Sequence, residues 1–501
     1  MSPASVASPV SARAHAHRWY EFPLRVAALV ATFTAFAVYE CNHLLALTNN
    51  DIWWRQRTGQ WILHNHAIPR SGLFSQWPAL PWVDASWGFD TLVADFRAPV
   101  LPMLLLYLQV AMAAALVALA FRTSRKFWPA IALAAIAQFC LMPLQPRPAL
   151  CSIILLSVEL TLVLAARRTG DARVLFWLPL VFVAWVNLDR QFSYGLLVLA
   201  LFCVAAIVEQ VSRRSGATWF GASSSAMRLR TLGAVAAASF LATFVSPYGW
   251  RLHALLWYSA THSAADRYFR ELHSLRFRQP QDYLLMLLAM TAFFALGRRR
   301  SRDLFLIALL IFSSAISFRT MRDNWFVVVC SVAIIGNALR DEQANEPAGG
   351  GSRWRRGEML GVAALVLLVI VAVKPKFLLL PKLSETFPVR AAAYIRQNHL
   401  PQPVFNTYEW GGFLTWYLPE YPVSIDSRTD LYPDEVYLAY FRLMQAEVPL
   451  ESDPAFARAQ TILLEANSPI AQALRTLPGF REVYRDNVAV VLVRGNEGLF
   501  R

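Results

Sequence analysis

The chain has 501 residues, of which 56% are hydrophobic and only 16% are Asp, Glu, Lys or Arg. Because a soluble domain usually carries about 25% charged residues, this composition excludes an ordinary soluble protein and predicts a polytopic membrane protein. The net charge of +14 does not indicate a nucleic-acid partner, since much of the Lys and Arg lies in short clusters between apolar runs. That distribution is typical of the positive-inside rule.

Apolar runs recur along the chain, each close to the ~20 residues that a helix needs to cross a bilayer. Arginines precede the first run, as in a signal peptide, but no clear small-x-small cleavage site follows it, so we favour an uncleaved helix. We predict an α-helical membrane domain over residues 23–374 with about eleven transmembrane helices. Their runs are 23–44, 98–121, 127–144, 149–166, 174–188, 192–211, 231–248, 282–297, 303–318, 325–339 and 358–373.

Basic clusters occupy alternate loops between these runs. They are Arg122 to Lys126, Arg167 with Arg168, Arg213 and Arg214 with Arg228 and Arg230, Arg298 to Arg300, and Arg353 with Arg355 and Arg356. The positive-inside rule places these loops, and the N-terminal tail of residues 1–22, in the cytoplasm. An odd number of spans then leaves the C-terminal region outside. No phosphate-cradling glycine motif lies in the cytoplasmic loops, so ATP-driven transport has no support.

Polar residues gather instead in the loops predicted on the outer face. The first of these, residues 45–97, is rich in Trp, Asp and Arg, and its pattern predicts amphipathic helices on the membrane surface at Trp53–Asn65 and Ala85–Phe96. A second long outer loop, residues 250–281, carries histidines, arginines and acids.

Residues 375–501 have the composition of a soluble domain, and helical and strand patterns alternate along them, which predicts an extracytoplasmic α/β domain. Helices are expected near 388–398, 434–446 and 468–476, and strands near 404–406, 423–425, 460–464, 481–485 and 488–493. Asp426, Arg428 and Asp430 follow a predicted strand, where ligand sites of α/β proteins often lie. A salt bridge within the turn explains these three residues at least as well.

Asp51 is the leading candidate for a catalytic residue, because it follows the first apolar run and so lies at the membrane surface. A carboxylate there can accept a proton from a hydroxyl group in general-base catalysis. Trp53 and Trp54 beside it offer flat faces to a sugar ring, or belong to the aromatic belt of the interface. The structural alternative is that Asp51 caps the N-terminus of an interfacial helix.

Four arginines lie at predicted outer ends of spans, where the positive-inside rule disfavours them: Arg147, Arg190, Arg319 and Arg322. Guanidinium groups match phosphate in a bidentate manner, so these arginines are candidates for binding a lipid phosphate. Alternatively each snorkels or pairs locally, for example Arg190 with Asp189.

Asp84 either joins Asp51 as a second acid or caps the second interfacial helix. The outer histidines lack the spacing of a zinc site. The five cysteines have no CxxC spacing and predict neither a disulfide framework nor a metal site. No cofactor is therefore certain, and dependence on a divalent metal stays open.

Several segments resemble a set of bacterial polytopic membrane proteins related to the GT-C-fold glycosyltransferases. The resemblance covers nearly the whole chain and is carried by Asp51–Trp54 with Arg57–Ile62, Pro81–Asp84, Arg147-Pro148, Trp185–Asn187, Ser246–Arg251, Arg322–Asn324, Phe405-Asn406, Trp410–Leu414 and Ile425–Tyr432. It implies a GT-C-like domain in the bacterial cytoplasmic (inner) membrane.

What the resemblance implies for activity is sugar transfer on the outer face. GT-C enzymes take a sugar from a polyprenyl-phosphate carrier and use an acid in the first outer loop as base, a position that Asp51 matches. The partners would be a polyprenyl-phosphate-linked sugar, membrane lipids and an unidentified envelope acceptor. Outer arginines would stabilise the departing lipid phosphate.

The chain departs from its relatives at three positions. Asp51 follows two asparagines, whereas many GT-C families carry neighbouring acids, Arg55 stands where relatives often have His, and Asp189 where they often have Gly. The alternatives are a non-catalytic scaffold of envelope assembly and a secondary transporter, which should show broken helices or ionisable groups at mid-membrane. A cavity that joins Asp51 to the outer arginines would favour catalysis.

Overall fold

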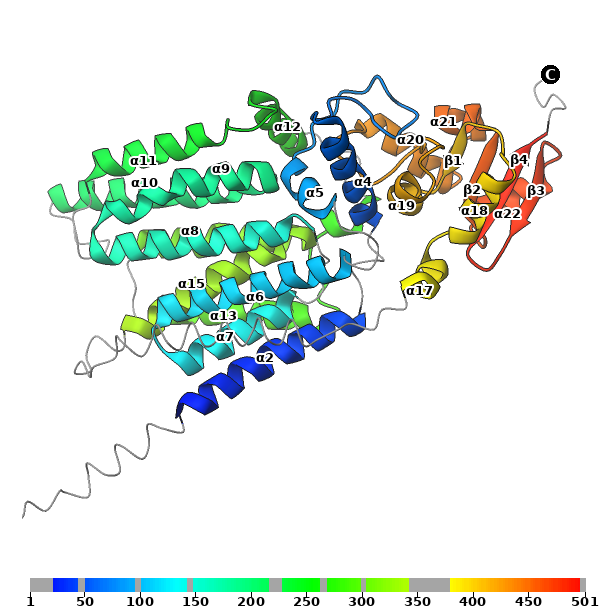
Figure 1. Ribbon diagram of the computed structural model, residues 1–501. Coiled ribbons are helices and arrows are strands. Elements are labelled where there is room, and N and C mark those ends of the chain that lie inside the picture. Colours follow the sequence, from blue (N-terminus) through cyan, green and yellow to red (C-terminus); the bar gives the residue numbers. More distant parts are fainter. Residues whose placement is uncertain are drawn as a thin grey trace, which may run out of the picture.

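The computed structural model describes residues 21–43, 50–94, 101–141, 147–215, 228–261, 268–298, 303–341 and 379–495. These residues form a bundle of apolar helices that is joined at one end to a small α/β domain (Figure 1). The predicted span at 358–373, the basic cluster at 353–356 and most of the N-terminal tail lie outside the described residues.

The bundle helices coincide with predicted apolar runs. They are α2 (Glu21–His43), α6 (Leu101–Ser124), α7 (Phe127–Leu141), α8 (Ala149–Thr169), α9 (Leu178–Leu188) after a 3-10 turn, α10 (Phe192–Arg214), α11 (Leu229–Ala242), α13 (Pro280–Arg298), α14 (Leu304–Arg319) and α15 (Asn324–Asp341). Among the described helices, four contain stretches long and apolar enough to cross a membrane: Leu106–Ser124, Ala149–Thr169, Phe192–Ser212 and Pro280–Arg298. This is the architecture of a multi-pass membrane protein.

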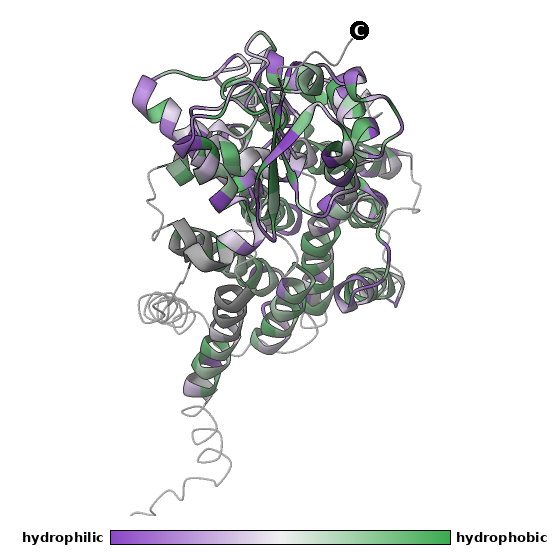
Figure 2. Ribbon diagram, turned by 90° about the vertical axis from the view of Figure 1, so that its right-hand side faces the viewer, coloured by the Kyte–Doolittle hydropathy of each residue, from purple (hydrophilic) through white to green (hydrophobic). Residues whose placement is uncertain are grey.

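Apolar side chains cover the outside of the bundle as well as its core. Trp325 and Phe305 are fully buried, whereas Leu241 and Phe294 are 64% and 67% exposed. In Figure 2, the bundle helices are mainly hydrophobic, whereas hydrophobic and hydrophilic residues are mixed in the C-terminal domain. Helices that are hydrophobic on all sides are typical of a lipid environment.

Ion pairs identify one end of the bundle. Arg167, at the end of α8, contacts Glu209 of α10 at 2.5 Å and Asp303, which caps α14, at 2.8 Å. The next residue, Arg168, donates a hydrogen bond to Asn337 of α15. The helix ends that carry the predicted cytoplasmic arginines therefore meet at this end. The C-terminal domain lies at the opposite end (Figure 1).

The first outer loop contains α4 (Asn50–Asn65) and α5 (Trp87–Ala94), which pack against each other. The two helices approach so closely that a Cβ at Gly59 would lie 1.9 Å from the carbonyl oxygen of Asp90. α4 also packs on α19 (Tyr408–Tyr417) of the C-terminal domain. The domain therefore covers apolar residues of α4 that the sequence pattern assigned to the membrane surface, among them Ile52 and Trp53.

The C-terminal domain has a four-stranded sheet in the order β1-β2-β4-β3, in which β1 and β2 are parallel and the other pairs antiparallel. Its strands are β1 (Val404–Asn406), β2 (Thr461–Glu465), β3 (Phe480–Arg485) and β4 (Ala489–Arg494). Its helices, besides α19, are α17 (Leu379–Thr386), α18 (Val389–Gln397), α20 (Asp434–Met444), α21 (Pro454–Arg458) and α22 (Pro469–Thr476). Four predicted strands thus appear within two residues of their expected bounds.

The predicted strand at 423–425 is not part of this sheet. Val423 instead forms an isolated bridge with Ser75 of the first outer loop. Beside it, the Gln76 side chain donates to the carbonyl of Val404 at 2.7 Å, and the Trp77 indole donates to that of Ser424 at 2.9 Å. The first outer loop thus packs against the C-terminal domain and forms hydrogen bonds with its backbone.

The second outer loop also contacts this domain. It contains the helix α12 (Trp250–Thr261) and a short 3-10 turn, η3 (Arg270–Leu272). Just before that turn, the Phe269 ring packs edge-on against Tyr437 and Phe441 of α20. Both long outer loops therefore converge beneath the C-terminal domain.

Candidate functional site

A polar cavity lies where the bundle, the outer loops and the C-terminal domain meet. Its basic residues are Arg55, Arg147, Arg190, Arg322 and Arg428, and its acidic residues are Asp51, Asp189, Glu271 and Asp430. Its volume is small, about 90 Å³. Ligand pockets usually measure about 300–1,000 Å³, so the cavity in this conformation is narrower than a typical ligand site.

Most of the site residues predicted from the sequence meet in this cavity: Asp51 and Trp54 of α4, Arg147 before α8, Arg190 after α9, and Arg322 in the 3-10 turn η4 (Met321–Asp323). They come from four separate segments of the chain. The cavity therefore joins Asp51 to outer arginines, the arrangement that favours catalysis over a scaffold.

Asp51 lies in the first turn of α4, inside the helix rather than at its N-cap. Its Oδ1 accepts a hydrogen bond from the Ser427 hydroxyl of the C-terminal domain. Burial raises the pKa of Asp51, and the nearby Arg55 guanidinium opposes that rise. A carboxylate with a raised pKa is a stronger base once it has lost its proton.

Arg55 lies between Asp51 and two buried acids, Asp84 and Asp90. Its Nη1 contacts Asp90 Oδ1 at 2.8 Å, and its guanidinium lies 4.3 Å from the centre of the Trp54 ring. Burial alone would lower the pKa of Arg55, but Asp90 and Asp51 hold it above its usual value. Arg55 thus keeps its charge beside Asp51.

Asp84 does not line the cavity. Its side chain is 2% exposed, and its Oδ1 accepts a hydrogen bond from the Ser86 amide just before α5. Burial raises the pKa of Asp84 to about 6, against the opposing charge of Arg55. Burial and the Asp84 carboxyl also raise the pKa of Asp90 well above its usual range. Asp84 therefore neither joins Asp51 in the cavity nor caps α5, which begins at Trp87. It holds the turn just before that helix.

Asp189 is a buried acid of the cavity, which the sequence indicated only as a possible partner of Arg190 and as a departure from relatives. The Ser152 hydroxyl donates to Asp189 Oδ2 at 2.6 Å, and the Trp185 indole donates to Ser152 Oγ at 2.7 Å. Burial raises the pKa of Asp189, while Ser152 and Arg190 lower it.

Carboxylates engage the arginines at the rim of the cavity. Arg147 contacts Glu271 at 2.8 Å, and Arg190 contacts Asp430 at 2.6 Å. Arg322 lies 3.6 Å from its neighbour Asp323, so local pairing holds for Arg322 but not for Arg190.

The Glu271 carboxyl is partly exposed at this rim. Burial favours its neutral form, yet Arg147 and Arg322 together hold the pKa of Glu271 below its usual value. Glu271 is therefore an anion beside the candidate phosphate-binding arginines.

Besides Asp84, two further predicted residues lie outside the cavity. Trp53 is buried at the junction of α4 with the C-terminal domain, where its ring packs edge-on against Phe387 and Phe413 and lies 4.7 Å from that of Trp416. Arg319, at the end of α14, is exposed and does not line the cavity. Trp53 is thus a packing residue, and Arg319 has no place in the site.

The turn after residue 425 forms one wall of the cavity. Asp426 and Arg428 form a fully buried pair, with Arg428 Nη2 at 2.6 Å from Asp426 Oδ2. The turn salt bridge therefore accounts for these two residues, whereas Asp430 reaches Arg190 in the cavity. The sequence assigns no role to Ser427 or Glu271, because nothing in their local pattern shows that they approach Asp51.

Among the described residues, no group of three or more His, Cys, Asp or Glu side chains is placed to hold a metal ion. The acids of the cavity are engaged by arginines, Ser152 and Ser427.

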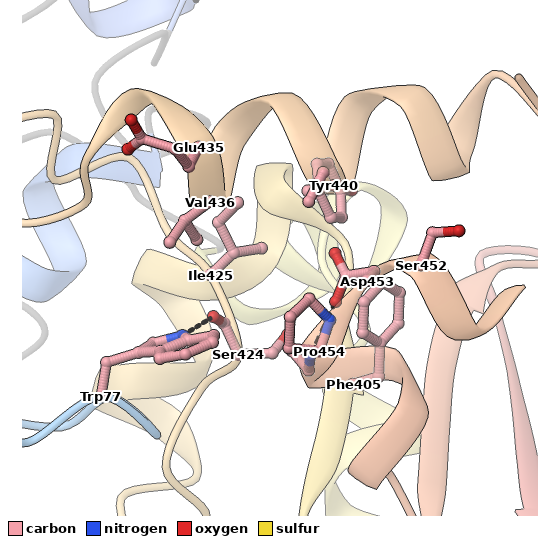
Figure 3. Close-up of a pocket in the computed structure, with 12 residues that line it drawn as sticks. Trp77, Phe405, Ser424, Ile425, Glu435, Val436, Tyr440, Ser452, Asp453 and Pro454 are labelled. Carbon is pink, nitrogen blue, oxygen red and sulfur yellow. Dashed lines mark hydrogen bonds between the residues drawn. The ribbon is translucent and has the colours of Figure 1, made fainter. Parts of the chain in front are cut away.

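A second cavity, of about 260 Å³, lies within the C-terminal domain (Figure 3). Its wall is mainly apolar and includes Trp77, Phe405, Ile425 and Tyr440. Asp453, which borders it, caps α21 by accepting from the amides of the two residues after Pro454.

No family model matches the chain, and no curated protein matches it. Two solved structures of ArnT from Cupriavidus metallidurans are similar to it. One, bound to undecaprenyl phosphate, has a TM-score of 0.45 and 13% identity, and the match covers 95% of this chain and 98% of that one. The other, in the apo state, has a TM-score of 0.44 with the same identity and coverage.

Proposed function

We propose that the protein is a membrane glycosyltransferase that moves a sugar from a polyprenyl-phosphate carrier to a hydroxyl group of an envelope acceptor. The observation that carries the proposal is that Asp51 shares one cavity with Arg147, Arg190 and Arg322. The cavity lies at the end of the bundle opposite the Arg167 cluster. By the positive-inside rule, that end faces outward.

In the proposed reaction, the acceptor oxygen attacks the anomeric carbon of the donor sugar. The bond from that carbon to the phosphate oxygen breaks, and its electron pair leaves with the polyprenyl phosphate. Asp51 takes the proton of the acceptor hydroxyl, so it must be ionised at the start of each turnover. Its raised pKa keeps the carboxylate basic enough to share that proton in the transition state.

The leaving phosphate gains negative charge as the bond breaks. Guanidinium groups bind phosphate oxygens in pairs, and fixed positive charges stabilise such a leaving group most when water is excluded. Arg147, Arg190 and Arg322 supply these charges in the proposal. Glu271 and Asp430 now hold two of them, in the way that phosphate oxygens would.

Binding of the donor requires the cavity to open, because about 90 Å³ cannot hold a sugar phosphate. The contacts best suited to open are the two rim pairs, Arg147 with Glu271 and Arg190 with Asp430, whose side chains are 18–50% exposed. Such pairs contribute only about 0–1 kcal/mol each. Contacts from the arginines to phosphate oxygens would offset the free energy lost when these ion pairs break.

A secondary transporter is the alternative that one observation favours. Glu159, within the apolar α8 helix, is fully buried, and both its carboxyl oxygens lack a hydrogen-bond partner among the described residues. Such a residue often marks a proton or ion pathway. If transport is the function, Glu159→Gln should abolish pH-dependent solute uptake into proteoliposomes. Uptake that is absent from the wild type as well would remove this alternative.

The transferase proposal can be tested with wild-type protein in proteoliposomes and a panel of polyprenyl-phosphate sugars. Release of free polyprenyl phosphate that depends on an added envelope acceptor supports it, and Asp51→Asn serves as the inactive reference. Asp171→Asn is the matched control, because Asp171 caps a 3-10 turn away from the cavity and Asn caps equally well. No release with any donor would favour the scaffold.

A further inference from the structure

A chain of hydrogen bonds runs from Trp54 through Ser427 to Asp51. The Trp54 indole nitrogen lies 3.2 Å from Ser427 Oγ, and the Ser427 hydroxyl contacts Asp51 Oδ1. An indole N–H can only donate, so Ser427 Oγ must accept from Trp54. The hydroxyl hydrogen of Ser427 is then left to point at the carboxylate, which fixes the direction of the chain.

The backbone around Ser427 is held from both sides. Its neighbours Asp426 and Arg428 form the buried pair described above, and the Tyr437 hydroxyl donates to the Asp426 carbonyl at 3.1 Å. Arg428 also donates to the Leu73 carbonyl of the first outer loop at 2.7 Å. These contacts fix the position of Ser427 without any contribution from Asp51.

The start of α4 is fixed independently of Ser427. The Asn50 side chain accepts from the Phe413 amide at 3.1 Å and donates to the Tyr408 carbonyl at 3.0 Å. A Cβ at Gly412 would lie 2.2 Å from the Asn50 carbonyl oxygen, so α19 and α4 meet backbone to backbone. Asp51 and Ser427 are therefore each held in place by contacts that do not involve the other residue.

We infer that Ser427 is a positioning residue for the proposed base Asp51, so that the C-terminal domain completes the catalytic site instead of merely holding a partner. The inference rests on the proposed function. With Oδ1 held by Ser427, the carboxylate has one fixed orientation toward the cavity. Preorganisation of this kind is what makes a general base effective, since the proton must move along one line.

The hydrogen bond favours the ionised form of Asp51, so it acts against the effect of burial on the pKa. Loss of the Ser427 hydroxyl should raise the pKa of Asp51, and less of the base would be ionised at neutral pH. The acid side of the activity profile should then move to higher pH by about one unit, the scale typical of such contacts.

The test compares transfer rates from pH 4.5 to 9 for the wild type, Ser427→Ala and Ser427→Thr. Ser427→Ala should move the acid limb upward by about one unit and regain most of its rate at high pH, while Ser427→Thr stays near the wild type. Ser452→Ala is the control, since Ser452 is exposed in the same domain and borders the other cavity (Figure 3). An unmoved midpoint in Ser427→Ala would overturn the inference.

A second measurement does not depend on sugar transfer. Hydrophobic carbodiimides react with protonated carboxyl groups, so peptide mass spectrometry of Asp51 labelling against pH reports its protonation directly. The labelling midpoint should rise in Ser427→Ala and, to a smaller extent, in Trp54→Phe, which keeps the Ser427 hydroxyl but removes the donor that orients it. Trp54→Phe also serves if Ser427→Ala fails to fold.

The two measurements separate the inference from the function on which it rests. Shifted labelling without transfer from any donor would contradict the glycosyltransferase proposal while keeping the contact between Ser427 and Asp51. Transfer by the wild type with unmoved midpoints in both variants would contradict the positioning role alone.

Discussion

Arg190 and Asp430 lie 240 positions apart in the chain, yet their side chains form an ion pair of 2.6 Å. Arg190 follows α9 at the end of the bundle opposite the Arg167 cluster, and Asp430 belongs to the C-terminal domain. The pair therefore joins the two parts of the molecule at the rim of the cavity. It also occupies an arginine that the proposed mechanism needs for phosphate.

Removal of the competing carboxylate should strengthen phosphate binding. Asp430→Asn frees Arg190 while keeping the size of the side chain, and we expect a polyprenyl phosphate to bind up to about five-fold tighter, the range of a partly exposed pair. Arg190→Gln should weaken binding instead. Equilibrium binding of a fluorescent polyprenyl phosphate in detergent measures both. Weaker binding to Asp430→Asn would show that Asp430 supports the phosphate site.

The outer arginines provide a matched pair only three positions apart. Arg322 lines the cavity, whereas Arg319 is exposed outside it. Arg322→Gln should lower the transfer rate by about 100-fold, as does loss of a donor that stabilises a developing anion. Arg319→Gln should stay within about two-fold. Equal losses in steady-state transfer would mean that both act through folding or through the general field of the outer face.

Asp84 gives the stability of the protein a dependence on pH. Burial raises the pKa of Asp84 from its ordinary value to about 6 in the folded state. The protonated form is therefore favoured on folding, and stability should fall as pH rises from about 4 to about 6, by on the order of 3 kcal/mol.

Asp84→Asn should remove this loss, because its amide oxygen can still accept from Ser86. Thermal unfolding in detergent should show a higher melting temperature for the variant than for the wild type at pH 8, and little difference at pH 4. If Asp84→Asn lowered the melting temperature by the same amount at both pH values, the conclusion that the buried Asp84 carboxyl is neutral would be contradicted.

The crossing of α4 and α5 should tolerate no side chain at Gly59. A Cβ there would lie 1.9 Å from the Asp90 carbonyl oxygen, so Gly59→Ala should lower stability by about 1–3 kcal/mol or more. Gly297→Ala is the control, since nothing lies within 4 Å of its Cβ. Melting temperatures of the two variants decide the matter. An unchanged value for Gly59→Ala would show that the helices can separate without cost.

The bundle helices and most of the C-terminal strands were predictable from the sequence, because apolar length and alternation are local properties. Placement of α4 was not. Its aromatic residues read as a membrane-facing surface, whereas Trp53 packs on Phe413 and Trp416 of a domain more than 350 positions away. Periodicity shows that a face is apolar but not which partner covers it.

The candidate site was predictable only in part, for a similar reason. Asp51, Arg147, Arg190 and Arg322 could be chosen as polar residues at outer ends of spans, and they meet in one cavity. Arg319 satisfies the same criterion and lies outside it. Convergence is a tertiary property, so the sequence could neither reject Arg319 nor show that Asp189 joins Asp51 in the cavity.

The central claim is that Asp51 is the base for sugar transfer, and a single-turnover measurement tests it most directly. Polyprenyl-phosphate sugar is bound to wild type, Asp51→Asn and Asp171→Asn, acceptor is added, and release of polyprenyl phosphate is followed. Loss of a general base costs about 100- to 10,000-fold, so Asp51→Asn should fall by that factor while donor affinity stays within a few-fold and Asp171→Asn matches the wild type. Release by Asp51→Asn at the wild-type rate would contradict the account.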